Sequence, residues 1–354
     1  MARVLPDTKL DFIHVLFQPK RSTVKSRNDV NLICNYTFKH SKNEYSGIPV
    51  MAANMDTIGT IDIAEALTKK QMFTVMHKFH KSESIVEMFK KNDDYQNTVA
   101  LSSGMSKVDI DQICKLIDHE NVPIKYVCLD VANGYSEDFV DFVRYTREKL
   151  PKTTIMAGNV VTDEMVQELI LAGADIVKIG IGPGSVCTTR IKTGVGYPQF
   201  SAILECADAA HDVNGFIISD GGCTCSGDVA KAIGAGADFV MIGGLLAGHD
   251  ECSGEVETDK ITGKKFKKFY GMASKTSMQL HSNKVCNYRA SEGRTVIIPY
   301  KGPVVHTIND ILGGLRSTCS YVGATSLKEL YHRATFIKVH RQYNSSMEMF
   351  TVKD

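Results

Sequence analysis

Short apolar runs, each bounded by polar or glycine residues, recur along the middle of the chain. Their centres are Val50, Val75, Val99, Val127, Ile155, Val177, Ile217 and Val240. The runs are apolar at consecutive positions and do not alternate with polar residues, which is typical of parallel strands buried on both faces. The pattern therefore predicts eight buried parallel strands.

Amphipathic stretches separate most of these runs. In the stretch Asp109 to His119, Ile110, Ile113 and Ile117 recur at helical spacing, and residues 163–171 also predict a helix. Strands that alternate with helices over about 200 to 250 residues fit a closed barrel better than an open sheet. We expect the fold class α/β, with a (β/α)8 TIM barrel.

One internal repeat supports the barrel. AGADIVKIG at 172–180 and AGADFVMIG at 235–243 agree at seven of nine positions, 63 residues apart. A helix end, a glycine, a short turn and a strand is the order that connects a helix to the next strand. The offset suits two strand–helix units, so these segments would hold the sixth and eighth strands; chance similarity of two turns is the alternative.

Beyond the eighth run the sequence leaves this alternation. Residues 254–271 alternate around a turn-prone centre and predict a β-hairpin excursion, with a lysine patch at 264–268 that we expect to be solvated. A strand at Thr295–Pro299 and a helix near Val304–Leu315 should follow. We expect residues 1–354 to form a single barrel domain, with an N-terminal arm at about 1–47 and a polar C-terminal tail at about 339–354.

The composition of the chain limits the kinds of partner that it could bind. The chain has 354 residues, 43% of them hydrophobic and 23% charged, with a net charge of +1. This balance is ordinary for a globular protein and argues against the broad basic face that nucleic-acid binding needs. No apolar run approaches the roughly 20 residues of a membrane span. We expect neither a nucleic-acid nor a membrane partner.

The cysteines indicate the compartment. The N-terminus MARVLPDTKLDF lacks the apolar segment of a secretory signal, and ten cysteines without such a signal indicate reduced thiols and a cytoplasmic location. Cys223 and Cys225 have C-x-C spacing, but no second pair completes a zinc site. A structural metal is therefore not expected, and a redox-sensitive pair stays an alternative to simple packing.

Residues that could bind a ligand or react with it directly follow the sixth, seventh and eighth apolar runs. The loop GPGSVCTTR, 182–190, holds Cys187 ahead of two threonines, SDGG places Asp220 before a glycine pair, and IGG ends on Gly243 and Gly244. In a TIM barrel the loops after the strands carry function, and those after strands seven and eight commonly bind phosphate. A nucleoside monophosphate would lie across the mouth, with Asp220 on its ribose and Cys187 placed to attack the base. A packed thiol is the alternative for Cys187.

Four segments carry a resemblance to a known family. In order they are GIGPGSVCTTRIKTGVGYPQ, SDGGCTCSGDVAKAIGAGADFVMIGG, EVETDKITGKKFKKFYGMASK and YRASEGRTV. Together they resemble the GMP reductases, within the inosine-monophosphate dehydrogenase and GMP reductase superfamily, over nearly the whole chain. The resemblance implies an enzyme that uses NADPH to convert GMP to IMP and ammonia. Cys187 would add to C2 of the purine, while Thr189 and Glu292 would protonate the departing amine.

The resemblance also implies ligand contacts. GMP or IMP would meet Ser185, Asp220, Gly221, Gly222, Gly243, Gly244, Gly271, Met272, Arg289, Ala290, Ser291 and Gly293. NADPH would meet Lys78, Asp130, Val131, Ala132, Ile181 and Gly182, and, from a neighbouring subunit of a homotetramer, Ser26, Arg27, Ser317, Thr318, Cys319 and Ser320. Carbonyls of Gly182, Gly184, Cys187 and Arg190 resemble a loop that binds a monovalent cation, K⁺. Ala273 departs from the serine usual in the family, which puts fine discrimination of the base in doubt.

Two other functions are weighed against this one. The dehydrogenase sister family oxidises IMP with NAD⁺, but it usually carries inserted regulatory modules early in the barrel and a long mobile flap. Residues 76–99 and 271–292 leave no room for either. A non-catalytic nucleotide-binding barrel would be expected to lack a catalytic residue, whereas Cys187, Thr189 and Glu292 are all present.

Overall fold

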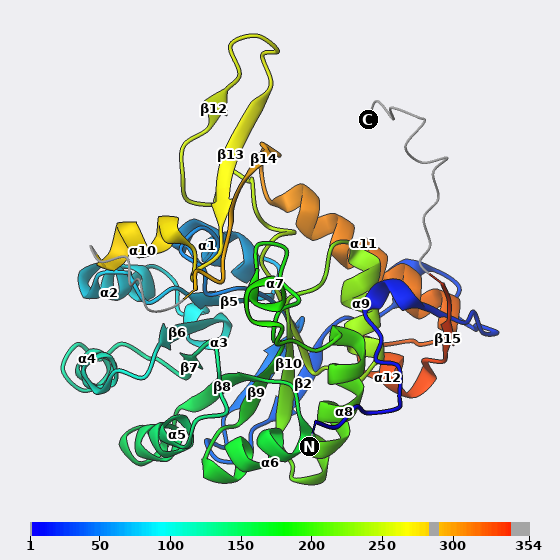
Figure 1. Cartoon of the computed structure of the whole chain (residues 1–354), viewed down its shortest axis with the longest axis horizontal. Helices are drawn as coiled ribbons and strands as arrows, with labels where there is room; N and C mark the ends of the chain where they lie inside the picture. The colour runs from blue at the N-terminus through cyan, green and yellow to red at the C-terminus, as the bar shows by residue number, and fades with distance from the viewer. Residues whose placement is uncertain (1, 283–289, 341–354) are drawn as a thin grey trace.

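The computed structural model describes residues 2–282 and 290–340. Eight parallel strands close into a barrel, and the last strand pairs with the first (Figure 1). They are β4 (Val50–Ala52), β5 (Phe73–Met76), β6 (Val99–Ser103), β7 (Tyr126–Asp130), β8 (Thr154–Val160), β9 (Ile176–Ile179), β10 (Phe216–Asp220) and β11 (Phe239–Ile242). Each contains one of the eight apolar runs, so the predicted TIM barrel is confirmed, with the repeated segments in its sixth and eighth strands.

Helices cover the outside of the barrel. They are α1 (Ile61–Thr68), α2 (Ser82–Lys91), α3 (Tyr95–Thr98), α4 (Lys107–Asp118), α5 (Glu137–Lys149), α6 (Asp163–Ala172), α8 (Gln199–Asp212) and α9 (Ser226–Gly234). Local sequence sets their ends: Ser136 accepts a hydrogen bond from Phe139 N at the start of α5, and Gly173 ends α6 with φ of 124°. Both predicted helices, 109–119 and 163–171, are present within a few residues of their expected bounds.

Alternate residues of the strands fill the barrel interior. Met51, Phe73, Tyr126, Ile176 and Phe239 form one buried cluster with side chains from the other strands. The other face of each strand packs against the helices in a larger core. This two-sided burial is why the strands appear in the sequence as continuous apolar runs.

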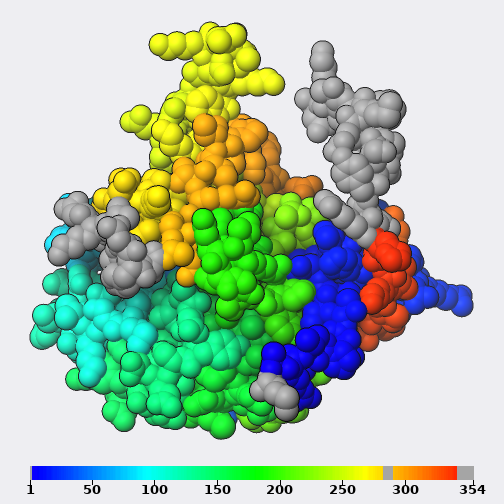
Figure 2. Space-filling model, viewed as in Figure 1, coloured from blue at the N-terminus to red at the C-terminus, as the bar shows by residue number. Residues whose placement is uncertain are grey.

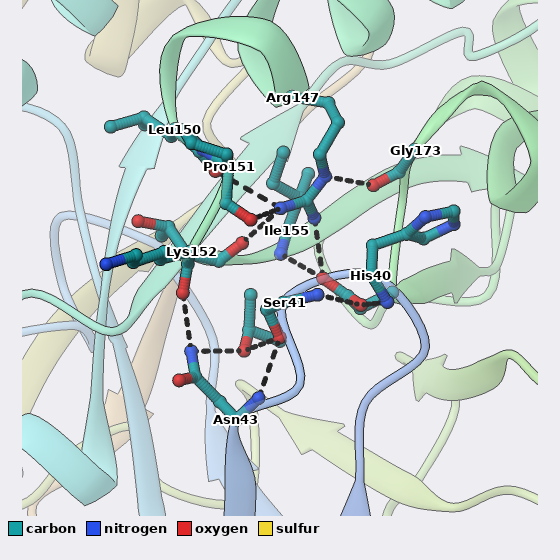
Figure 3. Close-up of polar contacts among 12 residues, drawn as sticks. His40, Ser41, Asn43, Arg147, Leu150, Pro151, Lys152, Ile155 and Gly173 are labelled. Carbon is teal, nitrogen blue, oxygen red and sulfur yellow. Dashed lines mark hydrogen bonds and ion pairs between the residues drawn. The ribbon is translucent and has the colours of Figure 1, made fainter.

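A short hairpin of β2 (Cys34–Thr37) and β3 (Glu44–Gly47) lies at the lower end of the barrel, where the strands begin. Its Phe38 and Tyr45 join the interior cluster and close that end. Beside it, Asp175 is fully buried, and its carboxylate pairs with Arg147 at 2.6 Å. Backbone N–H groups of His40 and Ser41 donate to the other carboxylate oxygen, and Arg147 donates to surrounding carbonyls (Figure 3).

A three-stranded sheet stands away from the barrel (Figures 1 and 2). It consists of β12 (Glu257–Thr258), β13 (Lys265–Tyr270) and β14 (Thr295–Pro299), which confirms the predicted hairpin and the strand after it. The prediction that the lysine patch at 264–268 is solvated is wrong at one position. Lys267 is only 3% exposed, because its ammonium donates to the carbonyls of His249 and Cys252 and ties the hairpin to the barrel.

The remaining elements join the ends of the chain to the barrel. Val15–Phe17 (β1) pairs with Phe336–Lys338 (β15), and the helix predicted near 304–315 extends over Val305–Val322 (α11). The others are η1 (Phe12–His14), η2 (Arg27–Asp29), α7 (Thr189–Thr193), α10 (Lys275–Ser282), η3 (Leu327–Glu329) and α12 (Leu330–Arg333). Within residues 2–282 and 290–340, no helix combines the length and the apolar character needed to span a membrane.

Candidate active site

The loop after β9 carries Cys187 into the mouth of the barrel. The thiol is half-buried, and Cys187 N donates to Gly184 O at 3.0 Å, which closes a tight turn in GPGSVC. The short helix α7 begins at Thr189 and ends at Thr193, and the next residue, Gly194, has a φ of 73°, in the left-handed region. Cys187 therefore lies between a glycine-rich turn and the first turn of a helix.

A second segment, from far along the chain, pairs with this loop. Cys187 and Gly293 form an isolated antiparallel bridge. Thr188 N donates to Glu292 O at 2.8 Å, and Arg294 N donates to Val186 O at 2.9 Å. These backbone contacts fix the segment around Glu292 against the cysteine loop, although about a hundred residues separate them in the sequence.

The three candidate catalytic side chains form a hydrogen-bonded row. Thr189 Oγ1 donates to Glu292 Oε2 at 2.7 Å and lies 3.2 Å from Cys187 Sγ. Since the single hydroxyl proton is directed at the carboxylate, the oxygen is left to accept from the thiol. This order allows a proton to pass from sulfur to carboxylate through the hydroxyl.

A cavity of about 120 Å³ lies beside this row, between the loops after β9, β10 and β11. The nucleotide-binding residues predicted on these three loops all line it: Ser185, Asp220, Gly221, Gly222, Gly243 and Gly244. Gly221 and Gly222 have φ of 86° and 85°, which suits glycine, and the absent side chains leave backbone groups open to a ligand. A Cβ on Gly244 would lie 2.7 Å from Ser185 Oγ, so this wall is also built for close approach.

The other predicted contacts of the nucleotide lie on two segments that meet behind the cysteine. Gly271 N donates to Arg294 O at 3.2 Å, and Ser291 Oγ donates to the carbonyl of Ala273 at 3.1 Å. Met272 Sδ accepts from Asp56 N, and Ala290 is exposed. Arg289 lies outside the described residues.

Two further cavities border the site. One, of about 390 Å³, places Thr189 and Glu292 on its wall together with the predicted cofactor residues Ala132 and Ile181 and the aromatic Tyr135. The other, of about 150 Å³, is lined by Asn54, Lys78, Phe79, Ser102, Ser103, Asp130 and Met272. Candidate cofactor residues thus lie in two cavities, one of them in direct contact with the candidate proton carriers.

The remaining cofactor residues form a separate group on the outside of the barrel. Ser26 caps η2, which packs against α11, the helix that carries Ser317, Thr318 and Ser320. Arg27, in η2, is exposed, whereas Cys319 is buried in the core. The structure does not bring this group into the cavities around Cys187 within one chain.

The predicted cation ligands share one loop. Gly184 O already accepts from Cys187 N, and Arg190 O accepts from Gly194 N at 3.2 Å. The Arg190 side chain packs on Gly182 and pairs with Asp11 at 3.3 Å. Among the described residues no cluster of His, Cys, Asp and Glu side chains is arranged to hold a metal ion.

One charged residue in the barrel mouth was not among the predicted site residues. Lys178 lies in β9 with its side chain 1% exposed and pairs with both Asp130 and Asp220. Asn159 Nδ2 donates to Asp220 Oδ2 at 2.9 Å and completes this group. The available signal was a lysine inside an otherwise apolar run, IVKI, where a charge is costly unless it is paired.

Comparison with known proteins gives one consistent result. The family model described as IMP dehydrogenase / GMP reductase domain matches residues 9–348. The chain is 59% identical to GMP reductase 2 of Mus musculus over 346 residues, 97% of this chain and 98% of the mouse protein. It is 58% identical to GMP reductase 1 of Homo sapiens, covering 98% and 99% of the two chains, and 56% identical to GMP reductase of Ascaris suum, covering 99% of each.

Proposed function

The chain belongs to the IMP dehydrogenase and GMP reductase family, and from this premise we propose that it converts GMP to IMP and ammonia with NADPH as reductant. The observation that carries the proposal is the row Cys187–Thr189–Glu292, joined by contacts of 3.2 and 2.7 Å beside the glycine-lined cavity. A nucleophile, a proton carrier and a carboxylate next to a phosphate-sized cradle suit covalent chemistry on a nucleotide.

Substrate binding follows from the cavity. The phosphate of GMP would lie against the backbone of Gly221, Gly222, Gly243 and Gly244, where no side chains intervene. The two ribose hydroxyls would donate to the Asp220 carboxylate. With both ends of the nucleotide held, the purine extends toward the cysteine loop, and C2 comes within reach of the sulfur of Cys187.

The covalent step uses the hydrogen-bonded row. Cys187 Sγ attacks C2 of the purine, its proton passes through Thr189 Oγ1, and Glu292 takes a proton at Oε2. Glu292 then returns a proton through the same hydroxyl to the exocyclic amine, which leaves as ammonia while the S–C2 bond remains. A positioned acid of this kind is typically worth about 10²–10⁴ in rate.

NADPH, when bound, supplies the hydride that reduces C2 and releases Cys187. The cavity of about 390 Å³ fits a nicotinamide ring by its residues, because Tyr135, Val161, Ile181 and Val195 give it apolar walls next to Thr189. Lys78 and Asp130 border the neighbouring cavity and would bind polar parts of the same molecule. Closure of the apolar walls over the ring would exclude water, so the thioimidate adduct is reduced rather than hydrolysed.

Oligomer, location and cation belong to the same proposal. Ser26, Arg27 and the half-buried Ser317, Thr318 and Ser320 would complete the cofactor site of a neighbouring subunit, with Arg27 on the 2′-phosphate, in a cytoplasmic homotetramer. The cysteines of the described residues are free thiols, which supports a reducing compartment. The carbonyls proposed for K⁺ are of the right donor type, and an oxygen that accepts one hydrogen bond keeps a second lone pair.

The dehydrogenase reaction is the second candidate, and the architecture disfavours it. Between β5 and β6 there are only α2 and α3, so no regulatory module is inserted there. The test is a comparison of initial rates with purified protein. GMP with NADPH should oxidise NADPH and release one ammonia per NADPH, while IMP with NAD⁺ should give no sustained turnover. Turnover of IMP, or GMP binding without NADPH oxidation, would refute the proposal.

A further inference from the structure

Lys178 is a buried cation in a strand whose other residues are apolar. Its neighbours in β9 are Ile176, Val177 and Ile179, all fully buried, and Ile176 belongs to the interior cluster of the barrel. Side chains alternate along a strand, so Lys178 is on the same inward face as Ile176. A lysine in this position must be fully paired, because an isolated buried ammonium is strongly destabilising.

The partners of Lys178 come from three different places around the mouth. Its ammonium pairs with Asp130 Oδ1, with Asp220 Oδ2 at 3.2 Å and with Asn54 Oδ1 at 3.5 Å. These residues end β7, end β10 and follow β4. An ammonium has three N–H donors, so each is used once.

The neighbouring strand is shaped to allow this pairing. Gly158 of β8 lies in register between Asp130 of β7 and Lys178 of β9. A Cβ on Gly158 would lie 2.6 Å from Lys178 Cβ, and a larger side chain would separate the ammonium from Asp130. Because residue 158 is a glycine, no side chain separates the two charges at this point of the barrel.

Both carboxylates reach the cavities that the proposed function fills. Asp220 is 22% exposed and lines the nucleotide cavity, while Asp130 is 35% exposed and lines the cavity beside Lys78. Within the described part of the chain, Asp220 Oδ2 pairs with the Lys178 ammonium and accepts a hydrogen bond from Asn159 Nδ2. Oδ1 is thereby left for a ligand. Burial alone would raise the pKa of Asp130, but the Lys178 ammonium outweighs it and holds the pKa below its usual range.

The repeat supplies an internal comparison. In the matching segment 235–243 the position of Lys178 is occupied by Met241, which is fully buried in the same interior. A methionine of similar length thus satisfies packing in this barrel layer. The charge of Lys178 needs a different reason.

We infer that Lys178 is a positioning residue, which fixes the carboxylates of Asp130 and Asp220 so that one buried cation holds both the nucleotide-binding and the cofactor-binding edge of the mouth. The inference rests on the proposed function, in which Asp220 binds the ribose and Asp130 faces the cofactor. Without the ammonium, the two carboxylates would repel one another, and of the two contacts to Asp220 Oδ2 the one from Asn159 alone would remain.

The test compares Lys178→Met with Arg147→Met, which breaks the buried pair at the other end of the same strand. Calorimetric Kd for GMP and steady-state KM for NADPH are measured beside thermal stability. We expect Lys178→Met to raise both constants about tenfold or more, the equivalent of one charged hydrogen bond. Arg147→Met should leave them within about twofold while lowering stability, and Lys178→Arg should restore most of the affinity.

Each outcome decides the inference. An unchanged Kd for GMP and an unchanged KM for NADPH in folded Lys178→Met would overturn the inference, while the proposed function of the wild-type protein would still stand. If Lys178→Met does not fold, the double variant Lys178→Met/Asp130→Asn is compared with Asp130→Asn alone. Equal GMP affinity in these two variants would also overturn it, and about tenfold weaker binding by the double variant would support it. Failure of the wild-type protein to bind GMP would instead refute the proposed function.

Discussion

Strands β9 and β11 flank β10 and each follow the same short sequence, AGAD, but their upper ends differ. At the lower ends, Asp175 accepts from Ile155 N and Asp238 accepts from Ile217 N, in each case the second residue of the preceding strand. At the upper ends, Lys178 faces two carboxylates where Met241 is simply packed. The shared residues build the barrel, and the differing ones serve the site.

The completeness of hydrogen bonding differs in the same way. The Asp175 carboxylate has four donors, from His40, Ser41, Ile155 and Arg147, and none of its atoms is left unpaired. Around the mouth, buried Asn159 Oδ1 and Gln199 Oε1 have no partner within the described residues. A fully satisfied network stabilises a fold, whereas polar atoms left over beside a cavity are typical of a binding site.

The loop after β9 should carry the chemistry, and Cys187→Ala should show it most strongly. Removing the nucleophile should reduce GMP turnover to below about a thousandth, because no other thiol takes its place in the row. GMP affinity should be nearly unchanged, since the glycines after β10 and β11 hold the phosphate. Initial rates and a GMP titration measure the two effects. Residual activity above a few per cent would exclude covalent catalysis by Cys187.

Glu292→Gln keeps the shape of the side chain and removes the acid. Turnover should fall by about 10²–10⁴, the usual effect of losing a general acid or base, while thermal stability should stay near that of the wild type. The reason is that Thr189 then has no carboxylate to receive its proton. A matching loss of stability would indicate that Glu292 serves the pairing of the two loops instead.

The lower end of β9 should show the opposite pattern. Arg147→Met leaves the buried Asp175 carboxylate without its cation and should lower the free energy of unfolding by about 3–5 kcal/mol. Denaturant titration measures this, and kcat with both KM values should remain within about twofold of the wild type. A selective loss of GMP affinity would contradict the division between the two ends of the strand.

The loop after β11 should affect binding rather than chemistry. In Gly244→Ala the new methyl group would lie 2.7 Å from Ser185 Oγ and intrude on the phosphate cradle. We expect KM for GMP to rise about tenfold with a smaller change in kcat, about the effect of losing one hydrogen bond to a charged group. If kcat falls and KM does not, the glycine pair acts on the reacting groups and not on the phosphate.

The smallest expected effect concerns a difference between the lower ends of β9 and β11, where Asp175 pairs with an arginine and Asp238 pairs with a histidine. The hydrogen bond to Asp238 raises the pKa of His211 above its ordinary value of 6.5, outweighing burial. A raised pKa contributes stability that is present below pH 6.5 and lost as the pH rises through the folded-state pKa. His211→Gln should therefore cost up to about 1 kcal/mol at pH 6 and less at pH 9.

Arg147→Met is the control for this pH dependence, because arginine stays charged across the same window. Its cost, measured by denaturant titration at pH 6 and pH 9, should be the same at both values. A cost of His211→Gln that does not change with pH would mean that His211 is not charged when it pairs with Asp238.

Much of this architecture could be predicted from the sequence, because strands buried on both faces give continuous apolar runs. The end of α11 could not be predicted, because residues 316–320 are mostly polar. Only Cys319 and Val322 continue the buried face of the helix as far as Gly323, whose backbone is left-handed. Buried lysines were missed for a related reason. Lys178 stands out as a charge in the apolar run IVKI, but the local sequence does not identify the acceptors that pair with it, and the same holds for the carbonyls that accept from Lys267.

The site could be predicted in part. The loops after β9, β10 and β11 were expected to meet, because parallel strands end at one edge of a barrel. The contact of Glu292 with Thr189 depended on family resemblance alone, since no periodicity brings residues a hundred positions apart together. The closure of the barrel by Phe38 and Tyr45 is likewise a tertiary contact that a short alternating segment does not reveal.

The most direct test of the central claim, covalent purine chemistry at Cys187, is mass spectrometry of the enzyme after acid quenching. Wild-type protein is mixed with IMP and NADP⁺ without ammonia, so that the thiol proton leaves, the C2 hydride passes to NADP⁺ and the S–C2 bond forms. We expect NADPH to appear in a burst matching the enzyme concentration, and the peptide containing Cys187 to gain the mass of IMP less the two hydrogens lost. NADPH formation without an adduct, or an adduct on another cysteine, would contradict it.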